Sequence, residues 1–466
     1  MASGRRNQNA IWALADEDGN FFEEESALKN LGQSHFSNIF KDDGTTCLSK
    51  QLRVIQLFPR MIPEGDAPNL TCPVTLGELE KALKSFKKDR SPGPDGWPVE
   101  FYLYFFDLIG EELLSAVEST RVSGLIPTSL NSTFIAIIPK KDKPRTFADF
   151  RPISLCNLLY KLISKVIAVR IKPFLDSCIS QEQYGFLKNR QITEPIGIVQ
   201  ESLHSIKTKN LCAFILKLDL VKAFDRVNST YVRLILIQIG APLQTVNWIM
   251  GCLSSATFAI LINGTPSNFF PASRGLRQGC PLSPLLFILV IEGLSLLIAD
   301  ARRNGLIRGI QISPTLALSH LLFVDDVILM GSGTMKEWAA FDVILDTFCK
   351  ASGMLISMEK SAFILNNIPS SDLLPLTRSI PYKEIPISMG FNYLGFFIKP
   401  LGYRTRDWDW LIKKFEKKIS LWTHKLLSLG GRLILVQSVL SSIPVYWMGL
   451  APIPQTLPAV ITLHVV

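Results

Sequence analysis

The sequence predicts an α+β fold, because it contains apolar strands that end in carboxylates and, around them, long helices with one apolar face. One apolar run covers residues 321–330 and is interrupted at its centre by Asp325 and Asp326, which indicates a β-hairpin with acid at its tip. A second run, 213–219, also ends in a carboxylate, Asp219. Residues 157–175 and 408–426 repeat apolar side chains with helical spacing.

The adjacent carboxylates of the hairpin suggest a cation site. Two like charges at the end of a dry strand pair are costly unless something positive neutralises them. Oxygen ligands suit Mg²⁺, which takes further ligands from water and substrate phosphates. Asp219 lies 106 positions before Asp325 (325 minus 219), and two-metal phosphoryl transfer needs carboxylates from separate strands. A plain surface turn is the alternative, since Asp is common in turns.

Composition narrows the class of protein only broadly. The chain has 466 residues, 47% of them apolar, and a formal charge of +9 from 49 basic and 40 acidic residues, which weakly favours a polyanionic partner. Its eight cysteines form no C-x-x-C pair, so neither a zinc site nor a disulfide scaffold is expected. The apolar stretch 285–299 is interrupted by Glu292 and is too short to span a bilayer, so a buried helix and no membrane partner are expected.

The stretch between the two acidic strands carries a family resemblance. Residues 273–284 read Ser-Arg-Gly-Leu-Arg-Gln-Gly-Cys-Pro-Leu-Ser-Pro, and 323–326 read Phe-Val-Asp-Asp. Together they resemble the reverse transcriptase core of plant non-LTR, LINE-type retrotransposons, and further motifs in the same order extend the resemblance from residue 91 to residue 454. It implies a right-hand polymerase fold with an N-terminal linker region (1–70), fingers (71–210), a palm with an antiparallel catalytic sheet (211–375), and a primer-grip hairpin with a truncated helical thumb (376–466).

The resemblance implies an RNA-directed DNA polymerase that extends a primer 3′ end. Asp219, Asp325 and Asp326 correspond to the residues that hold two Mg²⁺ ions, and Lys360 corresponds to a lysine near the triphosphate that can protonate pyrophosphate. Val324 stands where many LINE-type enzymes have alanine before the aspartate pair.

Four residues are expected to bind the deoxynucleoside triphosphate. By resemblance, Lys140 and Arg151 meet its phosphates, although basic residues on a surface strand would look the same. Phe224 lies where family members exclude a 2′ hydroxyl, and without the resemblance it would read as a core residue. Gln278 offers an amide in a glycine-containing loop.

Neighbouring charged residues carry smaller expectations. In the same loop, Arg274 and Arg277 are expected to add positive charge. Asp225 and Arg226 are expected to form a local ion pair without a chemical role.

Template contacts are expected in residues 181–192, where aromatic and basic residues interleave. Tyr184, Lys188 and Arg190 are the candidates for stacking on bases and binding phosphates of single-stranded RNA, with a surface loop as the alternative. The basic face of helix 157–175, which includes Arg170, is equally compatible with contact to a template backbone and with simple solvation. The basic residues that precede the proline-glycine loop at 91–98 could contact phosphate, with a structural turn as the alternative; the family carries a similar motif, which favours phosphate contact.

The implied partners are an RNA template, a DNA primer and deoxynucleotides, within an intracellular ribonucleoprotein of the nucleus or cytoplasm. The chain is expected to lack the family's upstream endonuclease and its C-terminal zinc and ribonuclease H regions, and its tail at 456–466 departs from the family pattern. Two alternatives stay open: an inactive RNA-binding protein with a polymerase fold, and a decayed transposon fragment.

Overall fold

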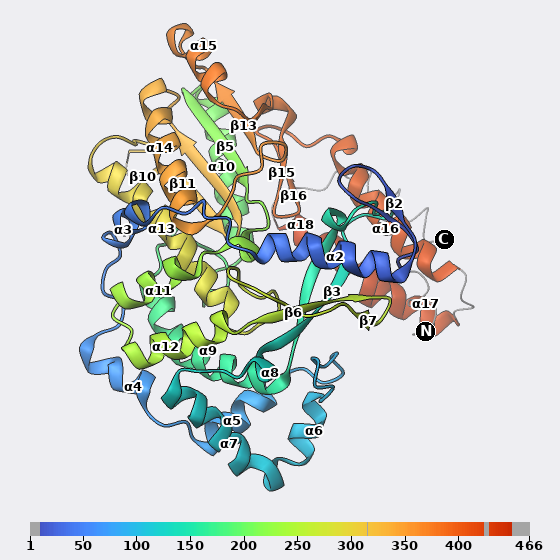
Figure 1. The fold of residues 1–466 in the computed structure, drawn as a ribbon. Helices are drawn as coiled ribbons and strands as arrows, with labels where there is room; N and C mark the ends of the chain where they lie inside the picture. Colours follow the sequence, from blue (N-terminus) through green and yellow to red (C-terminus); the bar gives the residue numbers. More distant parts are fainter. Residues whose placement is uncertain (1–9, 315, 424–427, 450–466) are drawn as a thin grey trace. The chain divides into compact units, whose positions relative to one another are not determined.

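The computed structural model describes residues 10–314, 316–423 and 428–449 and divides the chain into two compact units (Figure 1). Unit 1 comprises residues 1–188, 220–304 and 341–356, and unit 2 comprises residues 189–219, 305–340 and 357–466. Both units combine helices with sheets, so the fold is α+β as predicted. The division into linker, fingers, palm and thumb stays a prediction.

Unit 1 contains most of the helices. Its elements are β1 (Leu14–Ala15), β2 (Phe21–Phe22), α2 (Glu25–Phe40), α3 (Leu48–Ile55), η1 (Glu64–Asp66), α4 (Ala67–Thr71), α5 (Leu76–Lys84), α6 (Val99–Tyr104), α7 (Phe106–Ser123), α8 (Thr128–Asn131), β3 (Ser132–Pro139), η2 (Phe147–Asp149), β4 (Phe150–Cys156), α9 (Leu158–Cys178), η3 (Ala223–Arg226), α11 (Ser229–Gln238), α12 (Leu243–Ser254), β6 (Thr257–Ile262), β7 (Thr265–Pro266), β8 (Phe270–Pro271) and α13 (Ser283–Arg303).

The sheet of unit 1 has the strand order β4-β3-β6-β7, with β8 also paired to β6. Strand β3 pairs antiparallel with β4 and parallel with β6. Helix α2 packs against β6 (Figure 1), because its residues Leu28, Phe36 and Phe40 recur on one face and bury themselves in an apolar cluster with strand residues such as Phe258. Helix α2 is therefore amphipathic, with its apolar face against the sheet.

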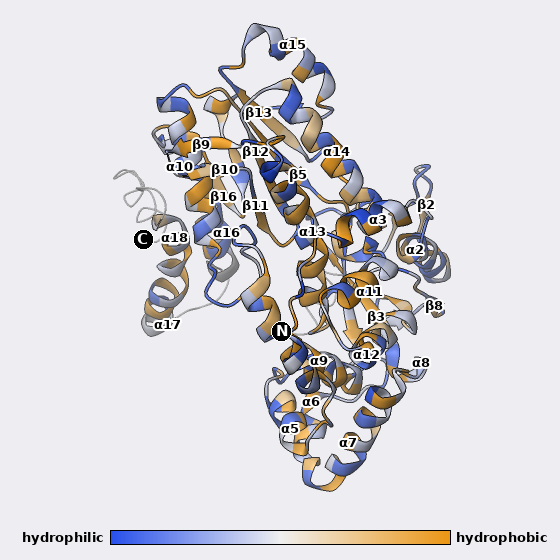
Figure 2. Ribbon diagram, turned by 90° about the vertical axis from the view of Figure 1, so that its left-hand side faces the viewer, coloured by the Kyte–Doolittle hydropathy of each residue, from blue (hydrophilic) through white to orange (hydrophobic). Residues whose placement is uncertain are grey.

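Helix α13 is the apolar centre of unit 1 (Figure 2). Among the described residues it is the one helix long and apolar enough to cross a membrane, but 78% of its most apolar window is buried inside the structure. The predicted buried helix is thus confirmed. Glu292 on this helix is buried and accepts hydrogen bonds from the backbone N–H and the hydroxyl of Ser180, which satisfies its carboxylate inside the core.

The predicted helices of unit 1 are present with small changes at their ends. Thr75 caps α5 by accepting a hydrogen bond from the backbone N–H of Glu78 at 3.2 Å. Helix α9 begins after Asn157 as expected and continues to Cys178, three residues beyond the predicted end, with Pro173 inside it.

Unit 2 holds the acidic strands. Its elements are α10 (Thr193–Thr208), β5 (Ala213–Asp219), β9 (Ile310–Ser313), β10 (Leu316–Leu318), β11 (His320–Phe323), β12 (Asp326–Gly331), β13 (Ala362–Asn366), α15 (Ser370–Ser379), β14 (Lys383–Glu384), η4 (Ile387–Met389), β15 (Phe391–Tyr393), β16 (Phe396–Ile398), η5 (Thr405–Trp408), α16 (Asp409–Thr423), α17 (Leu429–Ile434), η6 (Leu435–Leu440) and α18 (Ser442–Met448). Helix α14 (Met335–Ser352) begins in unit 2 and ends in unit 1.

The main sheet of unit 2 has the order β11-β12-β5-β13-β14. The hairpin partners β11 and β12 are antiparallel, and β5 is antiparallel to both of its neighbours, β12 and β13. Residues 327–330 of β12 and 213–216 of β5 are buried, so both predicted apolar strands are core strands. Trp338 of α14 packs edge-on against Phe214 on β5, which helps cover the sheet.

A second hairpin, β15–β16, occupies the predicted primer-grip segment. Its antiparallel register joins Phe391 to Ile398. Lys217 on β5 donates from Nζ to the backbone carbonyl of Asn392 at 2.8 Å, and the Trp447 indole N–H donates to the carbonyl of Gly395 at 3.1 Å. These two contacts tie the hairpin to the main sheet and to α18.

The predicted helix at 408–426 is confirmed for its first part. Trp408 ends η5, and α16 continues to Thr423. Residues 424–427 and the tail at 456–466 lie outside the described residues.

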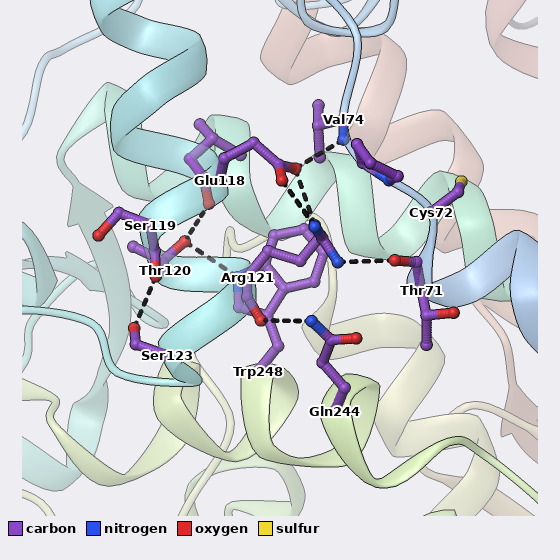
Figure 3. A network of polar contacts seen from close by, with 12 residues as sticks. Thr71, Cys72, Val74, Glu118, Ser119, Thr120, Arg121, Ser123, Gln244 and Trp248 are labelled. Carbon is purple, nitrogen blue, oxygen red and sulfur yellow. Dashed lines mark hydrogen bonds and ion pairs between the residues drawn. The ribbon is translucent and has the colours of Figure 1, made fainter.

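An ion pair buried in unit 1 connects three separate segments (Figure 3). Arg121 near the end of α7 donates two hydrogen bonds from Nε and one from Nη2 to the Glu118 carboxylate, at 2.7–3.0 Å, and its Nη1 donates to the Thr71 carbonyl at 2.6 Å. Glu118 also accepts from the backbone N–H of Val74. The Arg121 side chain is only 8% exposed, so removing it leaves a desolvated carboxylate and carbonyl behind.

We expect Arg121→Met to lower the free energy of unfolding by about 3 kcal/mol, because breaking a buried pair strands the remaining charge. Arg303→Met is the matched control. Its pair with Asp300 has the same i,i+3 spacing in the same unit, but the Arg303 side chain is 71% exposed, so the loss should stay below about 1 kcal/mol. Urea unfolding of both variants measures the difference. Equal losses would contradict the structural role given to Arg121.

Candidate active site

The two acidic strands bring their carboxylates to the same end of the unit 2 sheet. Asp219, the last residue of β5, is the direct cross-strand partner of Asp326, the first residue of β12. Asp326 is paired across the hairpin with Phe323, so Val324 and Asp325 form the turn. Residues directly opposite each other in a sheet share a face, and the three predicted catalytic carboxylates are therefore neighbours.

The hairpin turn itself is strained. Val324 is buried and has a φ of +57°, a left-handed conformation that is rare for a β-branched residue. Strain of this kind persists only where the surrounding structure enforces it, and it concentrates at functional sites. Two buried core strands on either side of the turn enforce it here. His320, at the start of β11, is buried with its Nδ1 3.0 Å from the Ser319 hydroxyl.

The electrostatics of Asp326 show how closely the carboxylates interact. Burial and the charges of Asp325 and Asp219 together raise the pKa of Asp326 to about 6, and Lys217 acts in the opposite direction. The neighbouring negative charges disfavour the ionised form of this carboxyl group, and a bound cation would favour it. The part of the chain that the structure describes contains no group of three or more His, Cys, Asp or Glu side chains placed to hold a metal ion by themselves. The oxygen donors fit Mg²⁺ by their chemistry.

Lys360 lies just before β13, the strand that pairs with β5 on the side opposite β12. Its Nζ lies 4.0 Å from an Asp219 carboxylate oxygen, and its side chain is largely exposed. The segment before β13 also fixes the backbone of Asp219: the Asp219 N–H donates to the Ser361 hydroxyl oxygen at 3.1 Å, and the Ser357 N–H donates to the Asp219 carbonyl at 2.8 Å. The structure thus brings together four predicted residues: Asp219, Asp325, Asp326 and Lys360.

Unit 1 contains the predicted nucleotide-binding residues. Phe224 lies on η3, partly buried, and stacks on Phe287 of α13 with ring centroids 4.3 Å apart and planes 8° from parallel. The loop at 273–284 closes over η3, because the Leu276 N–H donates to the Phe224 carbonyl at 2.7 Å. Gly275 has a φ of +97°, and a Cβ there would come within 2.6 Å of the Asp225 carbonyl, so only glycine permits this approach.

Lys140 and Arg151 lie on the β3–β4 ribbon. Both side chains are exposed, and Arg151 pairs across the sheet with Ile138. Lys140 is anchored by its N–H to the Asp149 carbonyl and by its Nζ to the Ala148 carbonyl at 3.0 Å. The positions are compatible with phosphate contact, and the roles of both residues stay predictions.

The predicted template residues separate between the units. Tyr184 and Lys188 belong to unit 1, whereas Arg190 belongs to unit 2. Lys188 is exposed, and its backbone N–H donates to Asp176 at 3.2 Å. Phe186 between them is 53% exposed with a φ of +60°, while Tyr184 is partly buried.

A cavity of about 570 Å³ in unit 1 lies between the basic face of α9 and the proline-glycine loop at 91–98, for both of which phosphate contact was one of two interpretations. Lys87 and Arg90 reach it from the loop before α6, Lys161 and Lys165 reach it from α9, and the rings of Trp97 and Phe186 also line it; no Asp or Glu is among its lining residues. Cations beside exposed aromatic rings are the chemistry that binds single-stranded nucleic acid. In the sequence, a tryptophan within a proline-glycine loop was the feature that pointed to this cavity, and the structure shows that Trp97 is exposed.

The structure contradicts the roles expected for several arginines, beginning with Arg226 and Arg274. Arg226 pairs with Asp43 at 2.7 Å and not with Asp225, which is buried and approached at 3.4 Å by the Gln278 amide nitrogen. The Arg274 side chain is 3% exposed and also pairs with Asp43. The physical reason is that a guanidinium presents five donors and is stabilised where several acceptors converge.

The guanidinium groups of Arg277 and Arg170 are likewise held by several acceptors inside the protein. Arg277 is buried, lies over the Tyr160 ring at 3.7 Å and donates to Asn131 and the Cys252 carbonyl, so it adds no charge to the surface. Arg170 on the basic face of α9 binds Glu78 and the carbonyls of residues 70, 72 and 73, which excludes it from phosphate contact.

The sequence did not predict two residues that lie near the proposed nucleotide-binding residues. His35 of α2 and Lys222 before η3 contact each other in unit 1. Residues 1–70 contain few recognisable patterns, so His35 gave no signal. Lys222 had one, its position three residues after Asp219.

Comparison with known proteins identifies the class. The family model described as reverse transcriptase (RNA-dependent DNA polymerase) matches residues 138–398, more than half of the chain. The chain belongs to the reverse transcriptase family.

Individual relatives point to mobile elements. The chain is 28% identical over 442 residues to the "Transposon TX1 uncharacterized 149 kDa protein" of Xenopus laevis, covering 94% of this chain and 33% of that protein. It is 26% identical over 381 residues to a "Retrovirus-related Pol polyprotein from type-1 retrotransposable element R2" of Popillia japonica, covering 75% and 50%. It is 27% identical over 220 residues to the "RNA-directed DNA polymerase from mobile element jockey" of Drosophila melanogaster, covering 46% and 24%. The chain therefore spans half or less of the length of these relatives.

We expect Asp326→Asn to raise the free energy of unfolding at neutral pH when divalent cations are chelated. The pKa of Asp326 is raised from its ordinary value of 3.8 to about 6 in the folded chain, so the folded state binds the proton more tightly. This stabilisation is complete below about pH 4 and is lost as the pH rises through 6. The gain of the variant should reach about 1–2 kcal/mol above pH 6, after allowance for partial exposure, and vanish below about pH 4.

Chemical unfolding between pH 3.5 and 8 measures this gain. Glu359→Gln, an exposed change in the same unit, is the control for loss of one negative charge. A gain for Asp326→Asn that does not change with pH would contradict the shifted pKa.

Proposed function

We propose that this chain is the RNA-directed DNA polymerase of a LINE-type, non-LTR retrotransposon of the plant type, with a right-hand arrangement of fingers, palm and thumb. The observation that carries the proposal is the pairing of Asp219 with Asp326 beside Asp325, on the sheet of a chain that belongs to the reverse transcriptase family. The substrates are an RNA template, a DNA primer and deoxynucleoside triphosphates. A nuclear or cytoplasmic ribonucleoprotein is the proposed location.

In this proposal the carboxylates of Asp219, Asp325 and Asp326 hold two Mg²⁺ ions. Such ions activate a 3′ hydroxyl and stabilise the charge that develops on pyrophosphate. The raised pKa of Asp326 supports the assignment, because a carboxyl group that resists ionisation alone gains most from a bound cation. Lys360, with its Nζ 4.0 Å from Asp219, donates a proton to the leaving pyrophosphate.

Residues of unit 1, together with Arg190 of unit 2, bind the substrates. Lys140 and Arg151 neutralise the triphosphate, Phe224 excludes a ribose 2′ hydroxyl, and Gln278 contacts the incoming nucleotide or template base. Phe224 is suited to its role because its stacking on Phe287 fixes the ring plane. Tyr184, Lys188 and Arg190 contact the template, and the cavity lined by Trp97 and Phe186 adds a place for unpaired bases.

We expect purified protein to extend a DNA primer on an RNA template in Mg²⁺, and the double variant Asp325→Asn/Asp326→Asn to lose at least about 10³-fold in rate, as when electrostatic groups acting on a transition state are removed. Glu359→Gln should retain activity. Primer extension followed on denaturing gels measures the rates. A folded wild-type chain that binds RNA but extends nothing would support the RNA-binding alternative and overturn the polymerase.

We expect Phe224→Ala to reduce the preference for deoxynucleotides over ribonucleotides by about tenfold or more in kcat/KM, because a smaller side chain no longer rejects the 2′ hydroxyl. Phe269→Ala removes an exposed aromatic ring of the same unit and should leave the preference unchanged. Single-nucleotide incorporation with dCTP and CTP measures the ratio. An unchanged ratio in Phe224→Ala would assign Phe224 to the core alone.

A further inference from the structure

A cluster of basic groups in unit 1 surrounds Lys222, outside the family-derived site. Lys222 lies before η3 with a φ of +46°, a left-handed conformation that turns the chain sharply after strand β5 ends at Asp219. Its Nζ is 3.1 Å from Nε2 of His35 on α2 and 5.9 Å from the centre of the Phe36 ring. Lysine has no acceptor, so the neutral His35 ring accepts the hydrogen bond.

His35 is held in place by aromatic rings. It stacks on Phe147 at 6.0 Å and meets the edge of Phe36 at 5.1 Å. The residue after Phe147 is Ala148, whose carbonyl binds Lys140 Nζ at 3.0 Å. The η2 turn therefore links His35 directly to one of the proposed phosphate-binding lysines.

The charges of this cluster are unbalanced. Burial, together with the charges of Lys222 and Lys140, lowers the pKa of His35 to about 4. Burial likewise lowers the pKa of Lys222 to about 8, with Lys140 and Arg226 acting in the same direction and Asp225 and Glu17 opposing them. The charged form of Lys222 is therefore disfavoured by burial and by Lys140, and a negatively charged ligand beside it would stabilise that form.

The main counter-charge, Asp225, also connects the cluster to the nucleotide site. Asp225 is 2% exposed, and its backbone N–H donates to the Lys222 carbonyl at 2.9 Å. One carboxylate oxygen accepts from the Gln278 amide at 3.4 Å. Burial raises the pKa of Asp225 to about 7, and Lys222 offsets part of that rise. A single buried carboxyl group therefore accepts a hydrogen bond from Gln278 and acts on Lys222 through its charge.

We propose that Lys222, oriented by His35 and Asp225, is a further cation of the site that binds the nucleotide polyphosphate. The inference rests on the proposed polymerase function and extends it to a residue of α2, in the region expected to be only a linker. Lys222 contacts the polyphosphate, whereas His35 and Asp225 are positioning residues. A polyphosphate supplies the several negative charges that Lys140 and Lys222 together require.

The first test measures polyphosphate binding without catalysis. Inorganic tripolyphosphate, with nucleic acid and divalent cations absent, should raise the unfolding temperature of the full chain by about 2 °C or more. Lys222→Met should abolish the rise and Lys222→Arg should restore it. Lys29→Met is the control, because Lys29 is on the same helix α2 and pairs with Glu25. A normal rise in folded Lys222→Met would overturn the inference.

The second test measures KM and kcat for dTTP on a poly(rA)–oligo(dT) substrate. We expect Lys222→Met to raise KM about tenfold, the equivalent of one charge-assisted contact, with little change in kcat. His35→Leu should raise KM in the same way, and His35→Gln, which keeps an acceptor, should recover most of the loss. Unchanged KM values in the folded variants would contradict the inference.

The two tests separate this inference from the polymerase proposal. If the wild-type chain binds tripolyphosphate through Lys222 but extends no primer, the anion site stands and the polymerase function fails. If the chain extends primers and Lys222→Met has normal tripolyphosphate binding and a normal KM, the polymerase stands and the role of Lys222 is wrong.

Discussion

The antiparallel pairing of β5 with β12 is the constraint on which the site depends. Its register sets Asp219 opposite Asp326, and a slip of one residue would move every side chain of the strand to the other face of the sheet. The register is enforced by the apolar residues of both strands, since residues 213–216 and 327–330 are buried. Thus the same apolar contacts that stabilise unit 2 also hold like charges together at the strand ends, where Lys217 and Lys360 oppose them.

The sequence predicted those elements whose pattern is local. Apolar runs predicted β5 and the β11–β12 hairpin, and the repeat of apolar side chains at helical spacing predicted α9. The neighbourhood of Asp219 and the Asp325–Asp326 pair was predicted from the family resemblance, because no local pattern relates residues so far apart in sequence. The structure supplied the register that makes them partners.

The roles of the buried arginines could not be predicted from the sequence. Arg274 and Arg277 occur in a loop whose composition indicates contact with a ligand, yet both side chains are buried against carbonyls, Asp43 and the Tyr160 ring. The acceptors come from α2, α8, α12 and neighbouring segments, and their convergence depends on tertiary packing. For the same reason, the contact of His35 with Lys222 had no counterpart in the sequence. A charge in a motif therefore shows its role only when its partners are known.

Divalent cation binding by the carboxylates of β5 and β12 is the most direct test of this account. Mn²⁺ prefers the same oxygen ligands as Mg²⁺ and is detected by electron paramagnetic resonance. The account predicts that wild-type protein and Glu359→Gln bind Mn²⁺ with equal affinity, and that Asp219→Asn/Asp326→Asn weakens binding by about tenfold or more. Unchanged Mn²⁺ affinity in the folded double variant would contradict the assignment of the cation site to these strands.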